Sequence, residues 1–94
     1  MTKAEVVAEI SNKTGIEKVA VQATVESFME TVKESLTKGD NVYLRGFGSF
    51  IIKHRAEKTG RNISKNTTIT IPAHNIPAFK PSKGFVSEVK NSVK

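Results

Sequence analysis

The chain has 94 residues, which suits one small domain, since domains usually hold roughly 100 to 200 residues. It contains no cysteine, so disulfides, thiolate nucleophiles and cysteine zinc sites are excluded. An acid, Glu5, stands where a secretory signal needs an apolar run, and no stretch approaches the apolar length of a membrane span, about 18 residues or more. We therefore expect a cytoplasmic protein without a membrane partner.

Charge is distributed unevenly along the chain. Residues 1–40 carry five lysines against seven acids, whereas residues 41–94 carry ten basic residues against two acids. No acid occurs between Glu57 and Glu88. Such a stretch is typical of a surface that follows a polyanion. It is interrupted by glycine, proline and asparagine, which does not fit a basic amphipathic helix on a membrane surface.

The first predicted elements are two helices. Thr2 and Glu5 form a capping-box pattern, which predicts a helix start at about residue 3, and Gly15 predicts the end of that helix. A longer helix follows, because apolar residues recur with the helical period. Lys38, expected in its last turn, and Gly39 after it mark its end. The apolar residues of this second helix are Val21, Val25, Phe28, Met29, Val32 and Leu36.

After residue 40 the apolar period changes from 3.6 to 2, which is typical of strands. Residues 41–45 and 49–55 are predicted as two strands joined by a tight turn at Gly46-Phe47-Gly48. Residues 67–71 resume a β-branched alternation. Because residues 56–68 contain almost no large apolar side chain, we expect an exposed hairpin with its tip near residues 62–66.

Three prolines and a serine predict the structure of the last part of the chain. Pro72, Pro77 and Pro81 predict an edge strand that is not hydrogen-bonded throughout. Ser82 is the predicted cap of a final helix. The expected fold is therefore α+β: a helix-turn-helix base, a three-stranded antiparallel sheet with a long β-ribbon arm, and a C-terminal helix. Because this chain offers little for a monomeric core, we expect a twofold dimer that shares its core.

Two patterns suggest other chemistry and are set aside. Arg45-Gly46-Phe47-Gly48 is similar to the start of an RNA-recognition octamer, but its fifth position is Ser49, and Phe47 and Phe50 cannot share one face of a regular strand. We expect these two rings to pack in a core or interface. The only histidines, His54 and His74, lack the acids or cysteines of a metal site. No catalytic constellation can be assembled either, so we expect neither an enzyme nor a cofactor.

Ile63 stands out at the expected hairpin tip. An apolar side chain there has no core to enter, and minor-groove proteins insert wedges of this kind between base steps. An ordinary exposed isoleucine is the alternative reading. Arg61 and Asn62 are residue types that fill or read a narrow minor groove, and Lys53, Arg55, Lys58 and Lys65 are expected to line the arm against phosphates.

Taken together, the chain resembles the HU and integration host factor family of bacterial nucleoid proteins. The resemblance rests on Gly46-Phe47-Gly48-Ser49-Phe50, on the run from Arg55 through Gly60-Arg61-Asn62, and on Ile76-Pro77-Ala78-Phe79-Lys80-Pro81. It implies one domain over residues 1–94, with a helical dimerisation base (1–40), a sheet (41–81) whose DNA-binding arm spans about 54–73, and a C-terminal helix (82–94). It further implies an intertwined dimer whose two arms embrace the minor groove and which bends and compacts DNA.

The resemblance also implies roles for individual residues. Arg61 and Asn62 match the arm-tip pair, and Ile63 stands where the family usually has an intercalating proline. The predicted dimer core comprises Phe28, Phe47, Phe50 and Phe79. The predicted DNA-binding residues are Lys3, Lys53, Arg55, Lys58, Arg61, Asn62, Ile63, Lys65, Lys80 and Lys83.

The expected partner is double-stranded DNA, including bent, nicked or junction forms, in the bacterial nucleoid. A second copy or a paralogue would complete the dimer. The basic charge alone would equally permit a small RNA-binding or ribosome-associated protein. A protein-interaction module that uses the proline-interrupted strand is a third reading, but it leaves the acid-free stretch unexplained.

Overall fold

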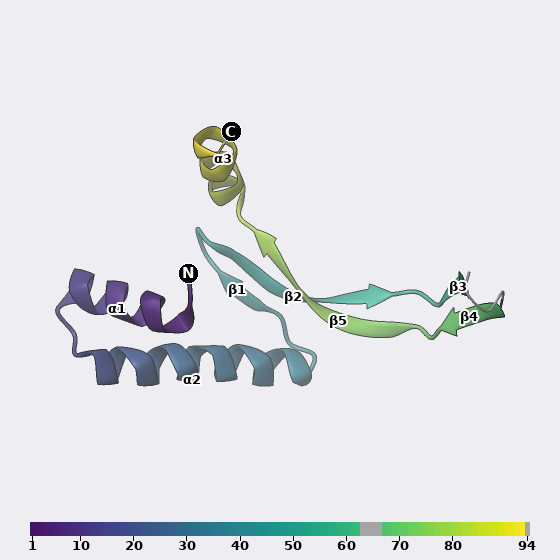
Figure 1. The fold of residues 1–94 in the computed structure, drawn as a ribbon, viewed down its shortest axis with the longest axis horizontal. Coiled ribbons are helices and arrows are strands. Elements are labelled where there is room, and N and C mark those ends of the chain that lie inside the picture. Colours follow the sequence, from purple (N-terminus) through teal and green to yellow (C-terminus); the bar gives the residue numbers. More distant parts are fainter. Residues whose placement is uncertain (63–66, 94) are drawn as a thin grey trace. The chain divides into compact units, whose positions relative to one another are not determined.

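The structure is a computed structural model that describes residues 1–62 and 67–93. It divides into a helical unit, Met1–Ser35, and a second unit, Leu36–Lys94, that holds the strands and the last helix (Figure 1). The α+β prediction is confirmed. In chain order the elements are α1 (Lys3–Thr14), α2 (Lys18–Thr37), β1 (Val42–Leu44), β2 (Gly48–Arg55), β3 (Lys58–Asn62), β4 (Thr67–Ile71), β5 (His74–Pro81) and α3 (Lys83–Ser92).

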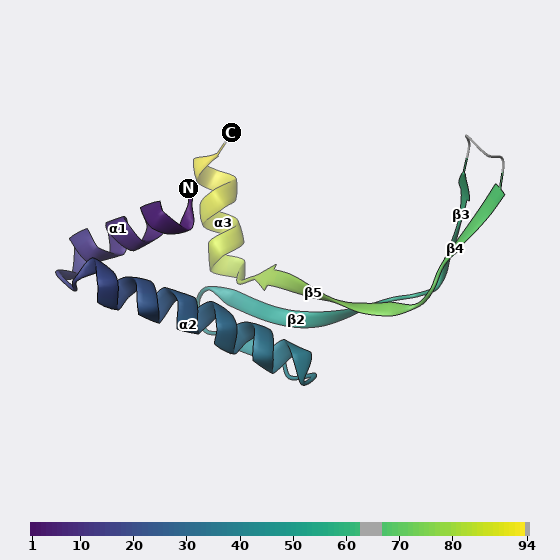
Figure 2. The ribbon, with the colours of Figure 1, turned by 60° about the horizontal axis from the view of Figure 1, so that its bottom comes forward.

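Side-chain and backbone caps define α1. The Thr2 hydroxyl accepts a hydrogen bond from the Glu5 amide at 3.3 Å and donates one to Glu5 Oε1 at 3.2 Å, which confirms the predicted start. Gly15 adopts a left-handed conformation (φ 76°) and donates its N–H to the Ser11 carbonyl, as predicted for the end of the helix. The chain then turns back at residues 15–17, and α1 and α2 diverge from this turn (Figure 2).

The end of α2 differs in one detail from the expectation. Lys38 lies just beyond the last helical residue, Thr37, so its predicted place in the last turn is wrong. The reason is that the Gly39 N–H donates to the Leu36 carbonyl at 3.0 Å, a tighter turn than the α-helical one, with Gly39 at φ 91°. The chain therefore leaves the helix one residue earlier.

Three antiparallel strands form the main sheet, in the order β1-β2-β5. The predicted turn joins β1 to β2, with the Phe47 N–H donating to the Leu44 carbonyl at 3.0 Å and Gly46 at φ 85°. β1 is shorter than the predicted strand. Just before β1 begins, a side chain replaces the backbone pairing with β2: Asn41 Oδ1 accepts the Ile52 N–H at 3.0 Å.

The arm continues the main sheet in one register. Arg55 pairs with His74 at the end of β2, and three residues further Lys58 pairs with Ile71 at the start of β3. The last described pair is Asn62 with Thr67, so the predicted tip lies outside the described residues. Figure 1 shows β3 and β4 extending the ribbon beyond β2 and β5. Residues 56–57 and 72–73 interrupt the ladder without shifting its register.

Pro72 explains this interruption. The Ile52 N–H points to Asn41, away from β5, so the Ile52–Pro77 pair needs no N–H from Pro77. Hydrogen-bonded and non-bonded pairs alternate along an antiparallel ladder, so Pro81 is tolerated in the same way. Pro72, five residues before Pro77, falls at a position that would have to donate to Glu57 on the opposite side of the ribbon. A proline has no N–H to donate, and the ladder breaks there. The predicted proline-interrupted edge strand is thus confirmed as β5.

Ser82 joins the last helix to the sheet. Its hydroxyl accepts from the Phe85 amide at 3.2 Å, which confirms the predicted cap, and donates to the Gly46 carbonyl at 3.0 Å. The Ser82 N–H also donates to the Phe47 carbonyl at 2.9 Å. The start of α3 is therefore tied to the β1–β2 turn.

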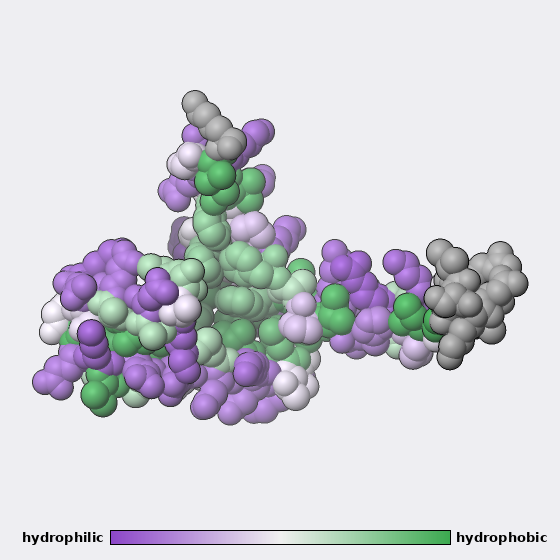
Figure 3. Space-filling model, viewed as in Figure 1, coloured by the Kyte–Doolittle hydropathy of each residue, from purple (hydrophilic) through white to green (hydrophobic). Residues whose placement is uncertain are grey.

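The core of the single chain is thin. Among the described residues only three apolar side chains are buried: Val7, Val21 and Val32. Large rings remain partly open, with Phe47 46% and Phe79 38% exposed. Figure 3 shows apolar side chains gathered at the surface over the sheet and α3. In the part of the chain that the structure describes, no helix has the length and apolar character needed to cross a membrane.

Candidate nucleic-acid interface

The two faces of the main sheet differ in chemistry. Successive side chains of a strand point to opposite faces, and paired residues share a face. One face carries the pairs Phe50–Phe79, Ile52–Pro77 and His54–Asn75; the other carries Tyr43–Ser49, Ser49–Lys80, Ile51–Ala78, Lys53–Ile76 and Arg55–His74. Three predicted DNA-binding residues, Lys53, Arg55 and Lys80, therefore lie on the same face. We call this second face, with Tyr43, Ser49, Lys53, Arg55, His74 and Lys80, the basic face.

An open groove of about 600 Å³ continues the basic face toward α3. Three cationic side chains line it: Arg45 after β1, Lys80 on β5 and Lys83 at the start of α3. None of its lining residues is acidic, so the potential in the groove is positive. Sequence reasoning assigned no binding role to Arg45. The sequence did contain a signal for Arg45. It lies two residues after Tyr43, so the alternation of the strand puts it on the same face as Tyr43.

The arm holds the remaining predicted contacts. Lys58 pairs with Ile71 at the base of β3, and the backbones of Arg61 and Asn62 pair with Thr68 and Thr67. Ile63 and Lys65 lie outside the described residues, so the predicted wedge is not placed.

Lys3 belongs to the helical unit and is engaged there. Its Nζ lies 3.0 Å from Glu26 Oε1, and Gln22 Nε2 donates to the same oxygen at 3.3 Å. The hydrogen bond from Lys3, helped by that from Gln22, holds the pKa of Glu26 below its ordinary value of 4.5.

Four phenylalanines cluster on the face opposite the basic face and beside α3. The Phe79 ring lies 5.1 Å from that of Phe47 and 5.0 Å from that of Phe50, measured between centroids. Phe47 and Phe50 can share this partner because Phe47 lies in the turn, where strand alternation does not apply. Phe85 stacks on Phe47 at 5.5 Å. The sequence analysis did not place Phe85 in this cluster. The available signal was the predicted cap Ser82, whose hydroxyl accepts the Phe85 N–H and donates to the Gly46 carbonyl beside Phe47. Phe28, also predicted in the dimer core, lies on α2 in the helical unit and is 42% exposed.

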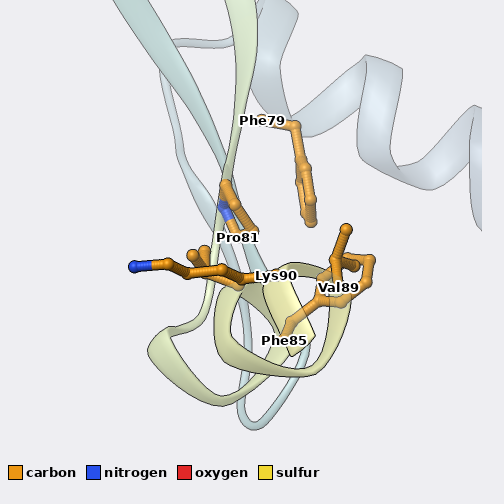
Figure 4. A pocket seen from close by; sticks show the side chains of 6 residues that line it. Phe79, Pro81, Phe85, Val89 and Lys90 are labelled. Atoms are coloured by element: carbon orange, nitrogen blue, oxygen red, sulfur yellow. The ribbon is translucent and has the colours of Figure 1, made fainter. Parts of the chain in front are cut away.

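An apolar groove of about 430 Å³ adjoins the cluster (Figure 4). Its walls come from the end of β5 and one side of α3. Val86 and Val89 in this wall are each nearly half exposed. Its lining residues are Phe79, Pro81, Phe85, Val86, Val89 and Lys90.

The histidines point to opposite faces of the ribbon. His54 Nδ1 lies 3.0 Å from Asn75 Oδ1 across the ladder, and His74 Nδ1 lies 2.9 Å from the Pro72 carbonyl oxygen. Within the described ranges, no three His, Asp or Glu side chains are grouped to hold a metal ion.

The chain combines two helices with a long β-ribbon, and its basic side chains gather on one face of the sheet and in the adjoining groove. These features define a class of small β-ribbon proteins whose surface can bind a polyanion. The chain belongs to the family described as Bacterial DNA-binding protein, whose model matches residues 1–90.

Named relatives agree over nearly the whole length. The chain is 41% identical over 90 residues to DNA-binding protein HU-alpha of Salmonella typhimurium, covering 96% of this chain and 100% of the relative. It is 40% identical over 95 residues to integration host factor subunit beta of Marinobacter nauticus, covering 100% and 97%. Its structure matches an Anabaena HU from a cocrystal with DNA, with a TM-score of 0.87, 35% identity and full coverage of both chains. The chain therefore has the HU fold.

Proposed function

We propose that this chain is an architectural DNA-binding protein that bends and compacts double-stranded DNA at the bacterial nucleoid. The observation that carries the proposal is the common face of Lys53, Arg55 and Lys80, from which the groove with Arg45 and Lys83 continues. Side chains of this kind bind phosphates and release counterions. The proposed activity needs neither catalysis nor a cofactor.

The distribution of charge favours contact with the DNA backbone. Phosphate contacts fix the position of a protein on the duplex but carry no sequence information, so we expect low sequence specificity. The arm, with Lys58, Arg61, Asn62 and Lys65, extends these contacts into the minor groove. Ile63 enters between base steps as the wedge. Lys3 adds a contact from the helical unit once it separates from Glu26.

We further propose that the functional unit is a dimer of two copies. The support is the thin core: the rings of Phe28, Phe47 and Phe79 stay 38–46% exposed, and the apolar groove of Figure 4 is open. Covering such rings with a second chain removes apolar area from water, worth about 25 cal/mol per Å². A heterodimer with a paralogue would use the same surfaces.

The test is a gel-shift titration with linear, nicked and four-way-junction DNA of unrelated sequence, each at two salt concentrations. We expect all three to bind, more tightly where the DNA is already distorted, because the cost of deformation is then smaller. Binding should weaken as salt rises. Salt-insensitive binding, or no binding at low salt, would refute the proposal. Preferential binding of duplex RNA in a competition would favour the RNA-binding alternative.

The dimer is tested separately by sedimentation equilibrium of the DNA-free protein. The expected mass is twice 10.3 kDa at micromolar concentration. A monomer with a cooperative unfolding transition would exclude a shared core.

A further inference from the structure

His74 lies on the basic face as the cross-strand partner of Arg55. Directly paired side chains have their Cβ atoms about 5 Å apart, so one phosphate can reach both. Lys53 lies two residues from Arg55 on the same face. His74 is exposed, as are Lys53 and Arg55, so all three can meet a ligand from solvent.

The hydrogen bond of His74 fixes which ring nitrogen faces a ligand. Nδ1 lies 2.9 Å from the Pro72 carbonyl oxygen, and a carbonyl only accepts, so Nδ1 carries a hydrogen and donates it. The neutral ring then presents Nε2 as an acceptor, which cannot bond a phosphate oxygen. A second proton must bind at Nε2, which turns that atom into a donor and gives the ring a positive charge.

We propose that His74 is a proton-dependent phosphate contact, so that DNA binding takes up a proton at its Nε2. This inference rests on the proposed function, since the phosphate is that of the bound DNA. Two positive charges on neighbouring strands repel each other, and a phosphate between Arg55 and His74 replaces this repulsion by two charge-assisted hydrogen bonds. The affinity for DNA should therefore rise as the pH falls.

The other charged and titratable groups nearby are few. Arg55 and Lys53 share the face with His74. Glu57, two residues after Arg55, lies in the interruption between β2 and β3. His54 lies on the opposite face, bonded to Asn75, and serves as a matched control because it has the same ring chemistry without the phosphate-facing position.

The experiment measures the dissociation constant for a linear duplex by fluorescence anisotropy at pH 7.5 and 5.5, each over a series of salt concentrations. Histidine changes charge within about this range. The unsubstituted protein should bind about threefold to tenfold more tightly at pH 5.5. Its plot of log K against log salt should steepen by about 0.9 for each added phosphate contact.

Variants assign the effect to one residue. H74Q should abolish both the gain in affinity and the steeper salt dependence, and H74K should bind with little pH dependence, because its charge is permanent. H54Q should retain the full gain. All other charged groups are common to the variants, so their contributions cancel in the comparison. Circular dichroism at both pH values verifies that each variant is folded.

A gain that survives in H74Q, a gain lost in H54Q, or no gain in the unsubstituted protein would overturn the assignment to His74 while leaving DNA binding intact. If no DNA binds at either pH, the proposed function fails together with this inference.

Discussion

Gly48 lies against the ring of Phe79: a Cβ added to Gly48 would be 2.6 Å from Phe79 Cζ and 2.6 Å from the Lys80 carbonyl oxygen. Gly48 is buried at the start of β2, where it pairs with Pro81. The absence of a side chain at Gly48 lets the Phe79 ring, which contacts Phe47 and Phe50, approach the strand this closely. The aromatic cluster therefore depends on a glycine for its geometry.

Gly48→Ala should destabilise the protein. The new methyl group meets a ring and a backbone atom that cannot both move aside, and overpacking of this kind costs about 1–3 kcal/mol. Urea denaturation measures the change in the free energy of unfolding. Gly84→Ala is the control, because nothing lies within 4 Å of a Cβ there and alanine favours a helix more than glycine. Equal stability of the two variants would contradict the packing argument.

Pro72→Val should restore the missing rung of the ladder. The new N–H points across the ribbon to the Glu57 carbonyl, to which it can donate, and its exchange with solvent deuterium should be slow. Pro77→Val is the matched control: its N–H points to the outer edge of β5 and should exchange quickly. NMR-detected amide exchange compares the two positions. Fast exchange at residue 72 would show that the proline does not cause the interruption.

The Lys3–Glu26 pair should make stability depend on pH in acid. Because the pKa of Glu26 in the folded chain is below the unfolded value, its contribution is present above about pH 4.5 and is lost as the pH falls through the folded pKa. Glu26→Gln should therefore be less stable than the unsubstituted protein at pH 7, and the difference should shrink as the pH falls through the folded pKa of Glu26. Thermal unfolding across this range tests the prediction, with Glu30→Gln on the same helix as a control. A difference that does not shrink as the pH falls would exclude an ionic origin.

Arg45→Ala should weaken DNA binding regardless of sequence. Arg45 lines the groove with Lys80 and Lys83, so its loss should lower the slope of log K against log salt by about 0.9 for one phosphate contact. Lys38→Ala removes the same charge just beyond α2 and should leave the slope unchanged. Equal slopes for Arg45→Ala and the unsubstituted protein would show that Arg45 does not contact DNA phosphates.

Ile63→Ala should reduce DNA bending more than DNA binding, because a wedge acts on the base step while phosphate contacts supply the affinity. Arg61→Ala should weaken both. Fluorescence energy transfer between the ends of a labelled duplex gives the bend angle, and anisotropy gives the affinity. Equal bend angles for Ile63→Ala and the unsubstituted protein would show that Ile63 does not act as a wedge and would favour the alternative reading, an ordinary exposed isoleucine.

Local signals in the sequence were sufficient for most of the elements. Thr2, Gly15, Gly39 and Ser82 act within a few residues of their own position, through caps and left-handed turns, so both ends of α1, the end of α2 and the start of α3 were predicted to within about a residue. The period of two in residues 49–55 likewise predicts a strand without knowledge of its partners. The overall fold was then inferred from the family resemblance, because Gly46-Phe47-Gly48 and the proline-rich strand occur in the same chain.

Cross-strand placement could not be read from local signals. The sequence by itself determined the helix ends that a cap or a glycine marks, the acid-free stretch and the alternation within each strand, because these depend on neighbours along the chain. Only the tertiary structure decided that Lys80 shares a face with Lys53 and Arg55, that Arg45 lines their groove, and that His74 lies opposite Arg55. The physical reason is register: a shift of one residue in the pairing of β2 with β5 would put each of these side chains on the other face.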